Sequence, residues 1–175
     1  MKLRNCLIII SSLFIIISIA IKSSDYYHNY KIEKKELNNI YNYLNNNIGN
    51  YISVLEIPKI NLKKGLNYNT NVDEDIVIID YNKFLNGDII LASHSGNCNT
   101  CYFNKLDKLI INDLVIIYKD NIKYIYKIES IEEKKKQTFK LEDSNNSVTL
   151  ITCKKNTDDI QIIIKGKLIN EEKYK

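Results

Sequence analysis

The amino-acid sequence predicts a mainly β protein, built as a small closed barrel or a sandwich. From residue 51 onwards, short apolar runs are separated by polar turns at intervals of about ten residues. One run alternates strictly, with Tyr124, Tyr126 and Ile128 on one face and Lys123 and Lys127 on the other. Apolar residues make up 45% of the 175 residues, which is enough for the core of one domain.

The N-terminal segment is an almost unbroken apolar run at residues 6–21, preceded by Lys2 and Arg4. A bilayer span needs roughly 20 residues and tolerates about 17, so this run is short for a span. A cleaved signal peptide and an uncleaved signal anchor both fit, and the absence of a clear Ala-x-Ala site favours the anchor. The positive residues place the N-terminal end in the cytoplasm. We therefore expect residues 25–175 to lie outside the cytoplasmic membrane.

A helix and an opening strand follow the apolar run. Residues 31–47 carry apolar side chains at roughly helical spacing among Lys, Glu and Asn, which predicts a juxtamembrane helix or stalk. The folded domain then opens with a strand at 51–57, and Pro58 must lie at a strand end or edge because it cannot donate to a ladder. We divide the chain into a membrane anchor, a stalk and a β-domain, at residues 1–24, 25–50 and 51–175.

The β-domain continues with short strands separated by polar turns. The predicted strands are residues 75–80, 88–94, 113–118, 122–128, 137–141, 148–152 and 159–168. The runs 113–118 and 122–128 form a hairpin, because Asp120 and Asn121 between them tolerate turn geometry. Residues 103–109 are suited to a single helical turn.

The charge pattern argues against nucleic-acid binding. The net charge is +4, and the lysines are interspersed with Asp and Glu rather than clustered. The only arginine is Arg4, so the β-domain has none. We expect no nucleic-acid partner and no cofactor.

Two chemically reactive side chains stand where predicted strands end. Cys153 ends the apolar run 149–152. His94, the only histidine of the β-domain, follows the run 88–91 after Ala92 and Ser93. A cysteine at the end of a buried strand is usually a small hydrophobe of the core. The polar residues after Cys153 instead place it where the strand meets solvent. A thiol and an imidazole in such positions are the parts of a Cys–His nucleophilic site.

The strand that follows Cys153 returns towards it. The connecting loop has about six residues, so an antiparallel return brings residues near Ile160 and Gln161 back beside the cysteine. Gln161 is the polar side chain on that strand nearest to Cys153.

Four segments stand out along the chain: Val54-Leu55-Glu56-Ile57-Pro58-Lys59-Ile60, Leu91-Ala92-Ser93-His94-Ser95-Gly96, Phe103-Asn104-Lys105-Leu106-Asp107-Lys108-Leu109 and Thr149-Leu150-Ile151-Thr152-Cys153. In this order they resemble the sortase family, the membrane-anchored cysteine transpeptidases of Gram-positive bacterial surfaces. The resemblance covers residues from about 51 to 170 and the N-terminal anchor. It implies a closed eight-stranded β-barrel with short helical turns.

The resemblance also implies a two-step acyl transfer. Cys153 would attack a backbone carbonyl in a surface protein's C-terminal sorting signal, typically Leu-Pro-x-Thr-Gly, and His94 would protonate the leaving amine. An amine from a peptidoglycan precursor or a pilin lysine would then release the acyl group. Sortases carry an arginine on the last strand, and Gln161 stands at that position. Its N–H groups can donate without charge, so the expected catalytic residues are Cys153, His94 and Gln161.

Two alternatives remain open from the residues. His94, Cys98, Cys101 and Cys153 are ligands of the types that zinc prefers. A solitary Cys-x2-Cys pair is a weak zinc signal, however, and outside the cell Cys98 and Cys101 could instead form a disulfide. The missing arginine supports a second alternative, a catalytically weak or inactive membrane-tethered β-domain that binds peptides.

Overall fold

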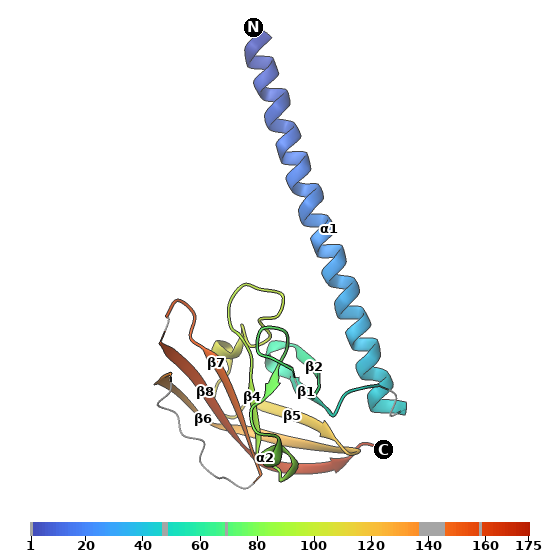
Figure 1. Cartoon of the computed structure of the whole chain (residues 1–175), viewed down its shortest axis with the longest axis vertical. Helices are drawn as coiled ribbons and strands as arrows, with labels where there is room; N and C mark the ends of the chain where they lie inside the picture. The colour runs from blue at the N-terminus through green and yellow to red at the C-terminus, as the bar shows by residue number, and fades with distance from the viewer. Residues whose placement is uncertain (1, 47–48, 69, 137–145, 158) are drawn as a thin grey trace. The chain divides into compact units, whose positions relative to one another are not determined.

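The computed structural model describes residues 2–46, 49–68, 70–136, 146–157 and 159–175 of the chain. The chain divides into two compact units, Met1–Asn39 and Ile40–Lys175, and each is described by itself (Figure 1). The predicted strand at 137–141 lies outside the described residues.

Helix α1 runs from Lys2 to Asn46; its residues up to Asn39 belong to the first unit and the rest to the second. Its large apolar side chains between Leu7 and Ile21 are exposed, and by length and composition the helix is able to cross a membrane. The apolar run and the helix predicted at 31–47 are parts of this one continuous element. The division at residues 1–24, 25–50 and 51–175 stays a prediction.

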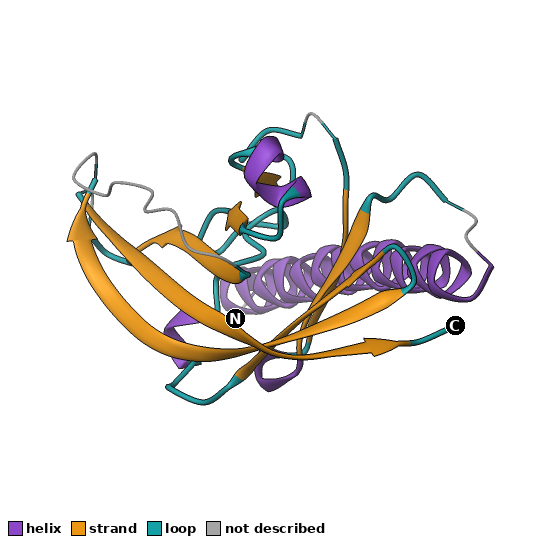
Figure 2. Cartoon of the chain, turned by 90° about the horizontal axis from the view of Figure 1, so that it is seen from below, coloured by secondary structure: helices purple, strands orange, loops and turns teal. Residues whose placement is uncertain are grey.

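The second unit is an eight-stranded sheet that curves into a nearly closed barrel (Figure 2). Its strands are β1 (Ser53–Ile57), β2 (Leu62–Leu66), β3 (Val77–Ile78), β4 (Ile89–Ala92), β5 (Leu114–Lys119), β6 (Ile122–Lys135), β7 (Ser147–Cys153) and β8 (Ile160–Lys173). Their order in the sheet is β2-β1-β5-β6-β8-β7-β4-β3. Strand β4 runs parallel to β7, and the other neighbouring pairs are antiparallel. The predicted mainly β, eight-stranded barrel is confirmed.

The barrel interior is filled by alternate residues of neighbouring strands. Leu91 of β4, Leu150 of β7 and Ile164 of β8 are at most 1% exposed and belong to one apolar cluster. Because successive side chains of a strand point to opposite faces, the intervening positions face outwards. Cys153 of β7 and Gln161 of β8 are in that outward-facing set.

Short helices connect the strands. Helix α2 (Tyr81–Leu85) is capped by Asp80, whose carboxylate accepts a hydrogen bond of 3.0 Å from the Lys83 N–H. The 3₁₀ helices η1 (Pro58–Ile60) and η2 (Leu106–Lys108) follow β1 and precede β5. Pro58 therefore lies just after a strand end, as predicted, and η2 falls within the helical turn expected at 103–109.

The sequence pattern missed strand β2 and misjudged the length of others. Strand β2 has two lysines and a glycine among its five residues, which leaves almost no apolar alternation to detect. The run predicted at 75–80 forms only the two-residue strand β3, and helix α2 was not predicted. The hairpin of β5 and β6 is confirmed, with Asp120 and Asn121 at φ values of 52° and 62°.

Candidate active site

The backbone of His94 is held beside Cys153 by the parallel pairing of β4 and β7. The register pairs Ala92 with Ile151, and the Ser93 N–H continues the ladder with a bond of 3.3 Å to the Ile151 carbonyl. His94 and Cys153 are the second residues beyond that pair on their two segments. The end of β4 and the end of β7 thus bring the predicted imidazole and thiol to one edge of the sheet.

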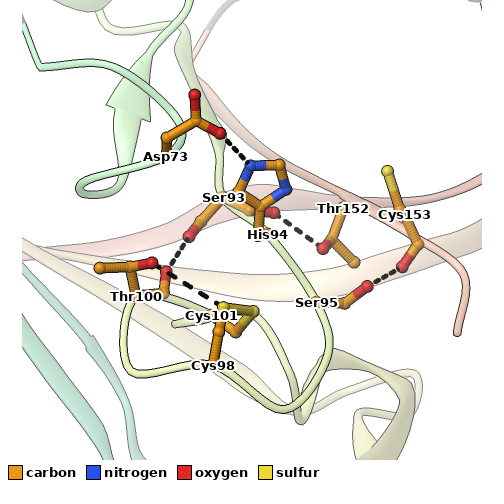
Figure 3. Close-up of a disulfide and its surroundings, with 9 residues drawn as sticks. All are labelled: Asp73, Ser93, His94, Ser95, Cys98, Thr100, Cys101, Thr152 and Cys153. Carbon is orange, nitrogen blue, oxygen red and sulfur yellow. Dashed lines mark hydrogen bonds and ion pairs between the residues drawn. A yellow bond between two sulfur atoms is a disulfide. The ribbon is translucent and has the colours of Figure 1, made fainter.

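Two side-chain hydrogen bonds on either side of His94 strengthen this pairing. The Thr152 hydroxyl donates to the Ser93 carbonyl at 2.8 Å, and both residues are buried. The Ser95 hydroxyl donates to the carbonyl of Cys153 (Figure 3). The residues before and after His94 are therefore each tied to the segment that carries the thiol.

The imidazole of His94 has an acidic partner that sequence reasoning did not identify. Its Nε2 lies 2.8 Å from Oδ1 of Asp73, in the loop between β2 and β3. Figure 3 shows the ring with Asp73 on one side and Cys153 on the other. Because Nε2 faces Asp73, a proton exchanged between this ring and another group would have to pass through Nδ1.

A local turn fixes Asp73 in place. The side-chain oxygen of Asn71 accepts hydrogen bonds from the N–H groups of Asp73 and Glu74, at 2.9 and 3.1 Å. This is the Asx-type turn that Asn forms readily, and it orders the backbone that carries the carboxylate. The Asp73 side chain itself is 82% exposed, so its interaction with His94 is screened by solvent.

Gln161 lies directly opposite Cys153, as the hairpin argument predicted. Strands β7 and β8 are antiparallel, and their register pairs Cys153 with Gln161. The Lys154 N–H bonds to the Ile160 carbonyl at 2.9 Å, which extends the ladder past the cysteine. Opposed residues of an antiparallel pair project from the same face of the sheet. The amide and the thiol are therefore neighbours, and three predicted residues gather at one place.

A cavity opens beside Cys153. It has a volume of about 170 Å³, and its lining includes Cys153, Thr152 and Ile162 together with Phe103 and Asn104. A second, wider hollow of about 490 Å³ shares Ser95, Cys153, Lys154 and Lys155 with it. Among the described residues, neither lining includes His94 or Gln161. The thiol thus borders solvent-accessible space at the end of the barrel, which a nucleophile requires.

Ion pairs border these hollows. Lys154 bonds to Glu133 at 2.6 Å, and Lys155 bonds to Asp107 at 3.0 Å. They join the loop after Cys153 to β6 and to η2, so the loop is fastened on both sides. Their side chains are 38–50% exposed, and each pair contributes little to stability by itself.

Cys98 and Cys101 form a disulfide in the loop that follows His94. Their Cα atoms lie 5.1 Å apart, within the range that a disulfide requires. Disulfide sulfurs are not the thiolate ligands that zinc binds, so the zinc alternative built on both cysteines does not fit this structure. The Phe103 N–H bonds to the His94 carbonyl at 3.1 Å, which closes the loop back onto the histidine.

The sequence model of the sortase domain family matches residues 55–169 of this chain. No match was found among curated protein sequences.

The structure is similar to several solved sortases. Sortase A from Listeria monocytogenes aligns with a TM-score of 0.63 at 18% identity, over 72% of this chain and 92% of that protein. A Clostridium perfringens sortase C, solved with the C-terminal cell wall sorting motif, aligns with a TM-score of 0.60 at 21% identity, over 82% and 90%. Sortase C1 from Streptococcus agalactiae gives a TM-score of 0.57 at 21% identity, over 69% and 68%. At these identities the likeness concerns the fold, whereas the domain match covers most of the chain. This protein belongs to the sortase family.

Proposed function

We propose that this protein is a cysteine transpeptidase that cleaves an LPxTG-like sorting signal and transfers the acyl group to a cell-wall or pilin amine. The observation that carries the proposal is the position of Cys153. It ends β7 at the border of a cavity, between the segment that carries His94 and the strand that carries Gln161.

In the first step, the thiolate of Cys153 attacks the backbone carbonyl carbon of the scissile peptide bond. The thiolate is the reactive form, so a nearby imidazolium that stabilises it promotes attack. As the C–N bond breaks, His94 donates its proton to the leaving amine, and a thioester between the substrate acyl group and Cys153 remains.

In the second step, the acceptor amine attacks the thioester carbonyl. Its proton passes to His94, the C–S bond breaks, and Cys153 leaves as the thiolate, which restores the starting protonation of the pair. Asp73 would hold the ring so that Nδ1 faces the reaction, because it accepts the hydrogen bond from Nε2. The side-chain N–H groups of Gln161 would donate to the negative oxygen formed in both steps.

Substrate and cellular placement follow from the same proposal. The apolar helix α1 would anchor the chain in the cytoplasmic membrane, with the β-domain outside, where sorting signals and acceptor amines meet. The C. perfringens relative solved with a sorting motif supports a sorting-signal peptide as the substrate class.

The direct test is to trap the thioester. The full chain in detergent would be incubated with a panel of peptides related to Leu-Pro-x-Thr-Gly and with an amine, and mass spectrometry would search for an adduct on Cys153. Cys153→Ala is the matched control and should form none. We expect an adduct whose mass identifies the cleaved bond, and a transfer product with the amine. Peptide binding without an adduct, at equal strength in both proteins, would instead indicate the non-catalytic binding domain.

A further inference from the structure

The proposed reaction develops negative charge twice, on the sulfur and then on the substrate oxygen. Gln161 can donate hydrogen bonds to that oxygen, but it brings no charge. Because the β-domain contains no arginine, any further cation at this site must be a lysine. The strand register identifies which lysine faces it.

Lys134 of β6 stands in the same row as Gln161 and Cys153. The β7–β8 register pairs Cys153 with Gln161, and the β6–β8 register pairs Gln161 with Lys134. Residues directly opposite in antiparallel strands project from one face, so all three side chains belong to the same face of the sheet. Two strand spacings separate the Cα atoms of Cys153 and Lys134 by about 10 Å. The stem of lysine is long and flexible, so its charge can act at a distance from the Cα atom.

The contacts of Lys134 support this orientation. Its Nζ lies 2.7 Å from Oε2 of Glu132, two residues earlier on the same strand face. The hydrogen bond and charge of Lys134, with a smaller contribution from Lys165, lower the pKa of Glu132. Lys165 of β8 pairs with Thr149 of β7, also on this face. The ammonium of Lys134 is therefore paired with Glu132 along β6, on the face of the sheet that also carries Gln161.

Of the two charged residues Glu132 and Lys134, the positive one stands nearer to the end of β7, where Cys153 lies. Glu132 pairs with Ile163, one row further from the end of β7 than Gln161. The positive member of the pair is thus the one in the row of Cys153. The two lysines that follow Cys153 line the hollows beside it and are paired with acidic groups, Lys154 with Glu133 and Lys155 with Asp107. Lys134 is distinguished from them by the strand register, which places it in the row of Cys153 and Gln161.

We propose that Lys134 brings to the row of Cys153 the positive charge that Gln161 does not supply, with its ammonium paired to Glu132 on the same face of β6. This inference rests on the proposed function and assigns Lys134 an electrostatic role in it. Lys134 need not touch the reacting atoms. Its positive charge attracts the thiolate of Cys153 and the negative oxygen from two strands away, across the position of Gln161.

The test compares Lys134→Gln with Lys135→Gln in the full chain in detergent. Both remove one lysine charge from adjacent positions of β6, but Lys135 pairs with Ile160 and belongs to the opposite face. The readout is the rate at which iodoacetamide alkylates Cys153 as a function of pH, followed by mass spectrometry of the peptide that contains it. A lysine with a purely structural role would not move this profile. Thermal unfolding checks that both variants are folded.

For Lys134→Gln we expect the midpoint of the alkylation profile to rise by about half a pH unit, as one charge about 10 Å away in a partly solvated site produces. At neutral pH the alkylation rate should then fall about threefold. Lys135→Gln should leave the profile in place, Lys134→Arg should retain it, and Glu132→Gln should lower the midpoint. In the Lys134→Gln background, Gln161→Arg should restore both alkylation and acyl transfer.

The result that overturns the inference is an alkylation profile for Lys134→Gln that coincides with that of Lys135→Gln. Activity of the unaltered chain decides the proposed function separately. If the chain transfers acyl groups but Lys134→Gln does not shift the alkylation profile, the role of Lys134 is refuted and the transpeptidase proposal is unaffected. If the profile shifts but no variant transfers acyl groups, the charge effect is supported and the transpeptidase proposal is refuted.

Discussion

Replacing Thr152 by valine tests whether the two strand ends must be tied together to form the site. The Thr152 side chain is 3% exposed, and its hydroxyl donates to the carbonyl of Ser93, the residue before His94, at 2.8 Å. Valine has nearly the same shape but cannot donate. The substitution therefore removes the bond without opening a large cavity.

The size of the effect follows from burial. A typical hydrogen bond contributes a net 0.5–1.5 kcal/mol, and leaving a buried acceptor without its donor costs about 1–3 kcal/mol. Ser93 is 2% exposed, so water does not replace the lost donor easily. We expect the free energy of unfolding to fall by about 2 kcal/mol. For a domain of this size, that corresponds to a melting temperature about 4–10 °C lower.

The assay is thermal unfolding of the full chain in detergent, with acyl transfer measured below the transition. Thr149→Val is the matched control, because Thr149 is also buried on β7 but its side chain belongs to the opposite face. We expect Thr152→Val to be less stable than Thr149→Val and to lose acyl transfer at least several-fold. Equal stability and equal activity of the two variants would refute the reasoning.

Four further predictions concern other contacts. Asp73→Asn should lower kcat/KM of acyl transfer severalfold at neutral pH, because it removes the charge that faces Nε2 of His94; an unchanged value would contradict an orienting role. Reduction of the Cys98–Cys101 disulfide should lower the free energy of unfolding by up to about 2 kcal/mol, measured with and without reductant and absent in the double serine variant. Gly166→Ala should destabilise the barrel by about 1–3 kcal/mol in denaturant unfolding, because its Cβ would lie 3.0 Å from Cγ1 of Val148 and 3.2 Å from the Lys127 carbonyl oxygen. Burial and the hydrogen bond to Glu56 raise the pKa of Tyr118, so its contribution to stability is complete below pH of about 10 and is lost as the pH rises further. Phenylalanine cannot ionise. As the pH rises from 7 to strongly alkaline values, the free energy of unfolding of Tyr118→Phe should therefore fall less than that of the unaltered chain.

The part of the site that lies within one hairpin was predictable from the sequence. A loop of about six residues between two apolar runs restricts which residues can face each other, and Gln161 was placed beside Cys153 on that ground. The position of His94 could not be reached in this way. Strand β4 is parallel to β7, and more than fifty residues separate them, so periodicity alone says nothing of their pairing. That expectation came from the two reactive side chains at the ends of predicted strands, and the resemblance to the sortase family supported it.

Asp73 shows a different limit of sequence reasoning. It lies in an irregular loop, where neither alternation nor helical spacing marks a residue as facing the site. The one local signal is Asn71, which predicts a turn but not what the turn presents. Only the fold brings this loop against the end of β4.

The face of the sheet on which Lys134 lies depends on a break in the alternation of β6. From Tyr126 to Ile128, successive residues of β6 pair with successive residues of β8. The side chains of Tyr126 and Ile128 point into the core. A bulge at Glu129 then shifts the pairing, so that Ser130 follows Ile128 as the next partner of β8. Extrapolated without the bulge, the alternation would place Lys134 on the interior face and Glu133 opposite Gln161. That arrangement would put a carboxylate in the row of Cys153 and Gln161. The extra residue reverses both faces of the strand end, so that Lys134 stands in this row and Glu133 pairs with Ile162.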